Sequence, residues 1–111
     1  MALSKTLSFP NGTSGSYIRL TSYRWDRTLR EASAIFALFA DADHAASAGD
    51  TPLLAVLAKL RLTGAKFDQY LGNAALAGHD VLGQLYLAAK AERLIPGGGL
   101  TSLNLADAAD V

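Results

Sequence analysis

Residues that could do chemistry are few in this sequence, and they are spread along it. Asp41, Asp43 and His44 place two carboxylates and an imidazole within four residues, and all three are ligand types for a divalent metal. Their spacing matches no calcium-binding loop and no further acid adjoins them, so a solvated surface loop is the favoured interpretation. His79 and Asp80 precede a predicted helix, where Asp80 would interact with the positive end of the helix dipole.

The remaining motifs predict no ligand site. The glycines at 97–99 are followed by no lysine–serine pair and open no helix, so they indicate a linker rather than a phosphate-binding loop. Asn11-Gly12-Thr13 formally matches a glycosylation acceptor and is interpreted as a turn. The chain has no cysteine, and no serine, histidine and acid form a recognisable nucleophile motif. We therefore predict no catalytic residue, no metal site and no cofactor.

One predicted hairpin combines cations with aromatic residues, which are the components of a surface that binds single-stranded nucleic acid. Asp26 and Glu31 dilute this basic character, so a protein–protein contact is favoured, because Trp, Tyr and Arg contribute most to binding energy at such contacts. A nucleic-acid-binding sheet that uses Arg19, Tyr23 and Trp25 stays open as an alternative. The residues concerned are Arg19, Arg24, Trp25, Arg27 and Arg30.

Composition narrows the function classes further. The length of 111 residues fits one domain, and the formal net charge is zero with no block of like charge, so binding to nucleic acid or to an anionic membrane is not favoured. No window approaches eighteen consecutive apolar residues, and the N-terminal stretch lacks the apolar core of a secretory signal, so we expect a protein that is soluble when made. Half of the residues are hydrophobic and only 18% are charged. We interpret the apolar surplus as interface surface.

Alternating patterns predict four strands, at 3–9, 17–25, 29–40 and 53–63. In the second strand, Ile18 and Leu20 are expected on one face, with Tyr23 and Trp25 on the other. The second and third strands are expected to pair as a long hairpin whose turn end projects into solvent. The run at 33–40 is apolar on both faces, so it needs cover on both sides, and we expect a second polypeptide to supply part of that cover.

The C-terminal third predicts helices. Short helical turns are expected at 45–48, 67–71 and 74–77, and the main helix at about 79–94. Leu82, Leu85, Tyr86 and Ala89 recur at helical spacing and should face the sheet. The predicted fold is α+β, an antiparallel sheet of about four strands with one main C-terminal helix packed on it. Residues 1–96 would form the single domain and residues 97–111 a flexible C-terminal tail. The opposite face of the helix is also apolar, with Gly83, Leu87, Ala91 and Leu94.

Several short motifs resemble a known group of proteins. In order, the chain carries Lys5-Thr6-Leu7, Pro10-Asn11-Gly12, Tyr17-Ile18-Arg19-Leu20 and Tyr86-Leu87-Ala88-Ala89-Lys90, and it closes on Ala109-Asp110-Val111. This order is similar to that of the small structural proteins encoded in the tail modules of tailed bacteriophages and related prophage particles. The alanine-rich fourth strand and the three glycines depart from that pattern.

The resemblance implies a non-enzymatic subunit of the virion tail, at the baseplate or tail tip, that is present in several copies and is assembled in the host cytoplasm. Its partners would be other tail or baseplate proteins and copies of itself, with no nucleic acid and no membrane. A small ligand-binding or enzymatic α+β domain, with a pocket between helix and sheet, stays open as a second alternative. The expected interface residues are Tyr23, Trp25, Ile35, Phe36, Leu38, Phe39, Leu87 and Leu94.

Overall fold

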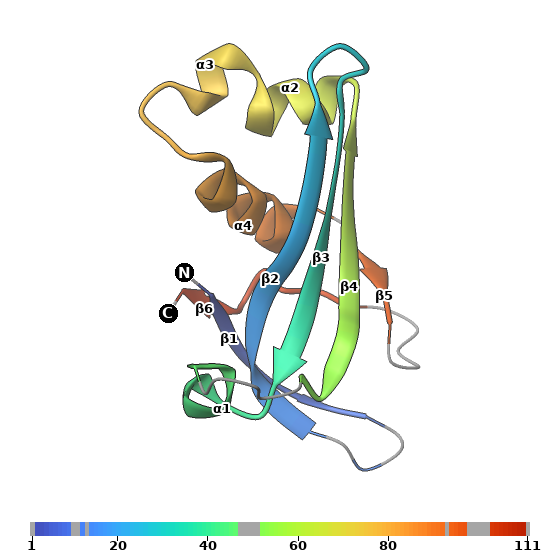
Figure 1. Cartoon of the computed structure of the whole chain (residues 1–111), viewed down its shortest axis with the longest axis vertical. Helices are drawn as coiled ribbons and strands as arrows, with labels where there is room; N and C mark the ends of the chain where they lie inside the picture. Colours follow the sequence, from blue (N-terminus) through green and yellow to red (C-terminus); the bar gives the residue numbers. More distant parts are fainter. Residues whose placement is uncertain are drawn as a thin grey trace.

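The computed structural model describes residues 2–9, 12, 14–46, 52–92, 94–97 and 103–110. It has a six-stranded antiparallel sheet in the order β5-β4-β3-β2-β1-β6, with most of its helices on one face (Figure 1). The predicted α+β class is confirmed, although the sheet has more strands than the four expected. The elements are β1 (Leu3–Ser8), β2 (Ser14–Asp26), β3 (Glu31–Phe39), α1 (Ala42–Ala46), β4 (Leu54–Thr63), α2 (Ala65–Leu71), α3 (Asn73–Leu76), α4 (Val81–Ala91), β5 (Ile95–Pro96) and β6 (Ala109–Asp110).

The long hairpin of β2 and β3 forms the centre of the sheet. Its turn is fixed by Asp26, whose carboxylate accepts hydrogen bonds from the amides of Thr28 and Leu29 at 2.8 and 3.1 Å. Arg30 closes the turn with a left-handed φ of 54°, so β3 begins at Glu31 and not at the predicted position 29. This end is exposed to solvent, as predicted, and it contacts α2 through an ion pair between the guanidinium of Arg30 and Asp68.

The main core lies between the sheet and the helices α2 and α4. From the sheet it takes side chains of β2, β3 and β4, and from α4 it takes Leu85, Tyr86, Ala88 and Ala89. The ring of Phe36 meets the edge of Tyr86 at 5.5 Å between centroids, a geometry that aromatic pairs favour. The largest fully buried side chains are Leu3, Ile18, Phe36, Leu38, Leu57, Leu60, Leu62, Leu71, Leu85 and Leu105.

The part of the apolar run at 36–39 is covered on both faces by its own chain. Phe36 and Leu38 are fully buried in the main core. On the opposite face, Ala37 and Phe39 form a second small cluster with Ala45 of α1 and with Tyr17. The expected second polypeptide is therefore not needed there. Phe36, Leu38, Phe39 and Leu94 are at most 4% exposed, so the prediction that they form an interface is wrong for the folded chain.

The predicted helices are present with shifted ends. The main helix α4 begins after Asp80, whose carboxylate caps it by accepting from the amide of Gly83 at 2.6 Å. Leu82 was expected on the sheet face but is 43% exposed, whereas Gln84 turns inward and donates to the carbonyl of Tyr70 at 3.0 Å. The single turn near 45–48 is displaced to α1, because Asp41 accepts from the amide of His44 and starts the helix earlier. Residues 47–51 lie outside the described residues.

The C-terminal segment differs from the expected flexible tail over its described part, 103–110. Leu105 and Ala108 are buried in the main core, and β6 pairs with β1 at Leu3 and Asp110. The ammonium of Lys5 anchors this segment, because it donates to the carbonyl of Asn104 at 2.6 Å and to the carboxylate of Asp107 at 2.8 Å. The two ends of the chain therefore lie side by side (Figure 1).

Gly15 of β2 sits where the strand passes closest to the end of β3. A Cβ atom there would lie 2.6 Å from the carbonyl oxygen of Phe39 and 3.0 Å from the side chain of Leu53. We expect Gly15→Ala to lower the free energy of unfolding by about 1–3 kcal/mol, because backbone must shift to admit the methyl group. Urea unfolding measures this, with Ser14→Ala at the exposed neighbouring position as the control, expected within about 0.5 kcal/mol of the wild type. Equal stability of the two variants would contradict the close approach.

Candidate functional site

A bulge in β2 decides which side chains share a face. The register with β3 shifts between Leu20 and Ser22, so one residue of β2 has no direct partner. Before the bulge, Ile18 and Leu20 face the main core; after it, Tyr23 pairs with Ala34 on that same face. The prediction that Tyr23 and Trp25 lie opposite Ile18 and Leu20 is therefore wrong.

The hydroxyl of Tyr86 on α4 satisfies the backbone at this bulge. The amide of Leu20 donates to it at 2.7 Å. A backbone N–H left without a partner next to a core is costly, so this bond stabilises the irregular strand. Burial raises the pKa of the Tyr86 phenol, while the bond from Leu20 acts in the opposite, weaker direction. Helix α4, which packs in the main core, thus also stabilises the bulge in β2 and the change of side-chain alternation that follows it.

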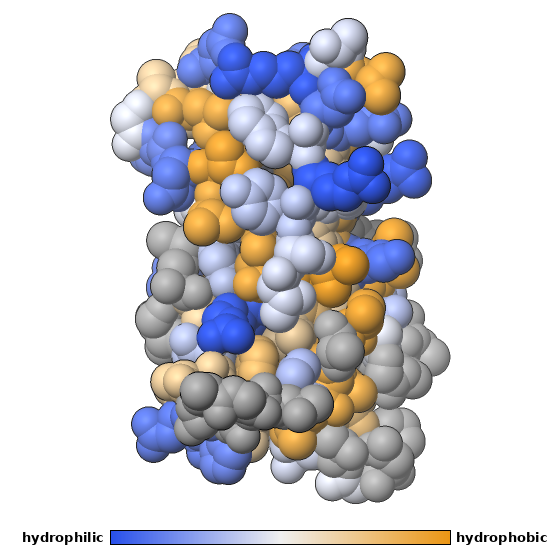
Figure 2. Space-filling view, viewed as in Figure 1, coloured by the Kyte–Doolittle hydropathy of each residue, from blue (hydrophilic) through white to orange (hydrophobic). Residues whose placement is uncertain are grey.

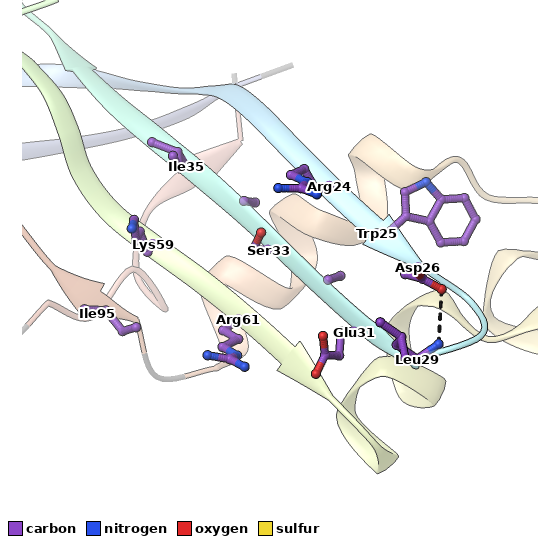
Figure 3. Close-up of a pocket in the computed structure, with 12 residues that line it drawn as sticks. Arg24, Trp25, Asp26, Leu29, Glu31, Ser33, Ile35, Lys59, Arg61 and Ile95 are labelled. Atoms are coloured by element: carbon purple, nitrogen blue, oxygen red, sulfur yellow. Dashed lines mark hydrogen bonds between the residues drawn. The ribbon is translucent and has the colours of Figure 1, made fainter.

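The other face of the sheet is open at the hairpin end. Arg24 of β2, Ser33 of β3 and Arg61 of β4 are direct partners and form one row across three strands. In the next row, Ile35 lies beside Lys59, and Lys59 pairs with Ile95 of β5. Figure 3 shows these side chains on the near face with the helix α4 behind the sheet. They line a shallow depression of about 560 Å³, which we call the open face.

The cations of the open face have no partner within the described chain. Arg24, Lys59 and Arg61 form no hydrogen bond or ion pair with any described residue. By contrast, Lys5, Lys66 and Lys90 are each matched with a carboxylate at 2.8–3.4 Å. Two acids, Asp26 and Glu31, close the open face at the hairpin turn without bonding to these cations. The open face is therefore a shallow, basic depression with an apolar contribution from Ile35 and Ile95.

Helix α1 lies on the same side of the sheet and covers Ala37 and Phe39. Arg19 lies over the ring of Phe39, 4.9 Å from its centroid, and donates to the carbonyl of Ala45 at 3.1 Å. Asp41 accepts from the amide and the ring of His44 at 2.8 and 2.7 Å, and these bonds, the backbone one foremost, lower the pKa of its carboxyl. No group of three or more metal-ligating side chains occurs in the part of the chain that the structure describes.

The aromatic residues of the hairpin lie away from the open-face cations. Trp25 stacks on Phe67 of α2 with 6.3 Å between centroids, and Arg27 covers it at 5.1 Å. The surface required by the nucleic-acid alternative, with Arg19, Tyr23 and Trp25 together, is not formed.

The pocket alternative needed polar groups converging between helix and sheet. In that seam the described residues place Gln84, whose amide donates to backbone carbonyls.

The remaining expected interface residues do not form one patch. Ile35 lies on the open face, Leu87 is 53% exposed on α4, and Tyr23 and Trp25 lie on the helix side of the hairpin. Sequence reasoning missed Lys59 and Arg61 as site residues, although their alternation with Leu60 and Leu62 had placed them together. Arg24 required knowledge of the bulge, for which the sequence carries no local signal.

The comparisons with known proteins add no relative. The chain matches no family model, no curated protein and no solved structure at a significant level. Within the described residues, no helix has the length and apolarity to cross a membrane.

Replacing Tyr86 tests the link between helix and bulge. We expect Tyr86→Phe to lower the free energy of unfolding by about 1–3 kcal/mol, since it leaves the part-buried amide of Leu20 without this acceptor. Chemical unfolding at pH 7 measures this, and Tyr23→Phe, at a position 42% exposed, is the matched control. A loss no larger than that of the control would show that the bulge does not depend on the hydroxyl.

The raised pKa of Tyr86 predicts a pH dependence at the alkaline end. Because the folded state holds the phenolic proton more tightly than the unfolded state, where the pKa is about 10, the stabilisation is complete below pH 10 and is lost as the pH rises through the folded-state pKa. We expect the wild type to lose more unfolding free energy above pH 10 than Tyr86→Phe does. Parallel slopes for the two proteins would contradict this. Tyr70, whose pKa is raised by burial and by Glu92, contributes equally to both.

Proposed function

We propose that this chain is a non-enzymatic structural subunit of a bacteriophage tail, located at the baseplate or tail tip and assembled through protein–protein contacts. Two independent lines support the proposal. The first is the motif order that resembles tail-module proteins. The second is the form of the candidate site, which is a flat face of strands rather than an enclosed pocket.

The open face is the observation on which the proposal depends. Strands β2, β3 and β4 present three cations and Ile35 to solvent beside Ile95 of β5, while helices α2 and α4 pack on the opposite side of the sheet. A flat surface of this kind suits a partner protein better than a small molecule, which needs a concave site that buries most of its area. Within the described residues, the buried side-chain polar atoms have hydrogen-bond partners.

A specific contact would extend beyond the depression itself. An interface of ordinary size buries about 800 Å² on each partner, which is about an eighth of the 6365 Å² exposed by the chain. Other large exposed apolar residues include Val56 in β4 and both Leu82 and Leu87 in α4. In the view of Figure 2, hydrophilic residues gather at the hairpin end of the molecule.

A stop codon early in the coding sequence of the phage or prophage that carries it tests the proposal. We expect filled heads with absent or incomplete tails by electron microscopy, and we expect the chain in purified intact particles by mass spectrometry. Supplying the wild-type chain in trans should restore tails. Normal, infectious particles in the absence of the chain would refute the proposal.

Reversing a charge on the open face tests whether that face makes the proposed assembly contact. We expect Arg61→Glu to fail to restore tails while keeping wild-type unfolding stability, because an exposed cation without a partner contributes little to folding. Arg27→Glu makes the same change of charge at the hairpin turn, on the Trp25 side, and should restore tails. If both variants restore tails, a surface other than the open face makes the assembly contact.

A further inference from the structure

The side of the sheet that carries the open face has two levels. At one end, α1 lies on β2 and β3 over Ala37 and Phe39 and forms a raised layer. At the hairpin end, the same strands carry no layer, and the surface is the shallow depression around Ser33 and Ile35. The two levels lie along one direction of the sheet, so the molecule has a step on this side.

The bare level carries a net positive charge, and the raised level, where Arg19 also lies, carries a net negative charge. The bare level has Arg24, Lys59 and Arg61, without partners among the described residues. The raised level has the exposed acids Asp41 and Asp43 of the α1 region. Bonds from His44 lower the pKa of Asp41, so its carboxylate stays ionised well below neutral pH. The raised level and the bare level are therefore complementary to each other in height and in charge.

We propose that the open face is covered by a second copy of this chain in an antiparallel, two-fold arrangement, with α1 of each copy lying against the bare level of the other. A two-fold contact requires that one patch be complementary to itself, since each residue pair occurs twice. A step with a basic recess and an acidic ridge meets that requirement. It also accounts for unpartnered cations on a chain whose formal net charge is zero.

The proposed dimer, which we call the pairing, rests on the proposed function in one respect, because it names a second copy of the chain as the partner at the assembly surface. It makes a separate physical prediction, since a dimer of the purified chain needs no other tail component. Charge complementarity of this kind chiefly fixes orientation and partner choice, and it weakens as salt screens the charges. The two carboxylates Asp26 and Glu31 at the hairpin turn would repel the acids of α1, so α1 of the second copy would lie over Lys59 and Arg61 rather than over the turn.

Sedimentation velocity of the purified full-length chain over a range of concentrations and salt tests the pairing. We expect a dimer whose Kd rises with salt. Arg61→Glu places an acid opposite the acidic α1 of the partner, and Asp43→Arg places a cation opposite Arg61, so each variant alone should raise Kd by at least about tenfold. Arg27→Glu, with the same change of charge outside the open face, should leave Kd unchanged.

The decisive measurement is an equimolar mixture of Arg61→Glu and Asp43→Arg. In a mixed dimer, one contact keeps the wild-type pair and the other contains the reversed pair, so both contacts become attractive. We expect the mixture to recover the dimer that neither variant forms alone, while circular dichroism shows all variants folded. No rescue in the mixture, or a dimer that is indifferent to Arg61→Glu, would overturn the pairing.

A chain that stays monomeric at all concentrations would also overturn it. If that monomer is still required for tails, the proposed function stands and another tail protein covers the open face. If the dimer forms and particles assemble normally without the chain, the pairing stands and the proposed function fails. Retention of the monomer on single-stranded DNA that is lost in Arg61→Glu would replace the pairing by nucleic-acid binding.

Discussion

The hydrogen bond between the amide of Leu20 and the hydroxyl of Tyr86 is the interaction on which the arrangement of both sheet faces depends. A strand that gains one residue must leave a backbone group without its ladder partner, and a buried group of that kind needs another acceptor. Helix α4 supplies the acceptor. Because the strand then resumes with the opposite phase, Trp25 reaches α2 and Arg24 reaches the open face.

Most of the apolar run in β3 is buried by the chain itself. One side of the run fills the main core, and the other is covered by five residues of α1 with Ala45 at the centre. What remains at the surface is Ile35, at the border between the covered and bare levels. The surface available for assembly is therefore more basic and less apolar than composition suggests, so salt should affect its contacts strongly.

The sequence was sufficient for the strands and helices whose patterns are local. Alternation located β1 to β4, and helical spacing near Asp80 located α4. The bulge, the displaced α1 and the two-residue strands β5 and β6 arise from contacts between distant segments, such as Lys5 with Asp107. Short strands of that kind have no periodicity of their own. Alternation alone places residues 59 and 61 on one face of the sheet. It does not place Arg24 on that face, because the bulge in β2 changes the alternation before residue 24.

The pairing of β1 with β6 has a mechanical consequence. Leu3 and Asp110 are neighbours in antiparallel strands, so a force that separates the chain ends acts across the pair and breaks its hydrogen bonds one after another. Such unzipping needs less force than shearing all bonds of a strand at once. Under tension the structure would yield first at this corner, and the long ladders of β2, β3 and β4 would carry load only afterwards.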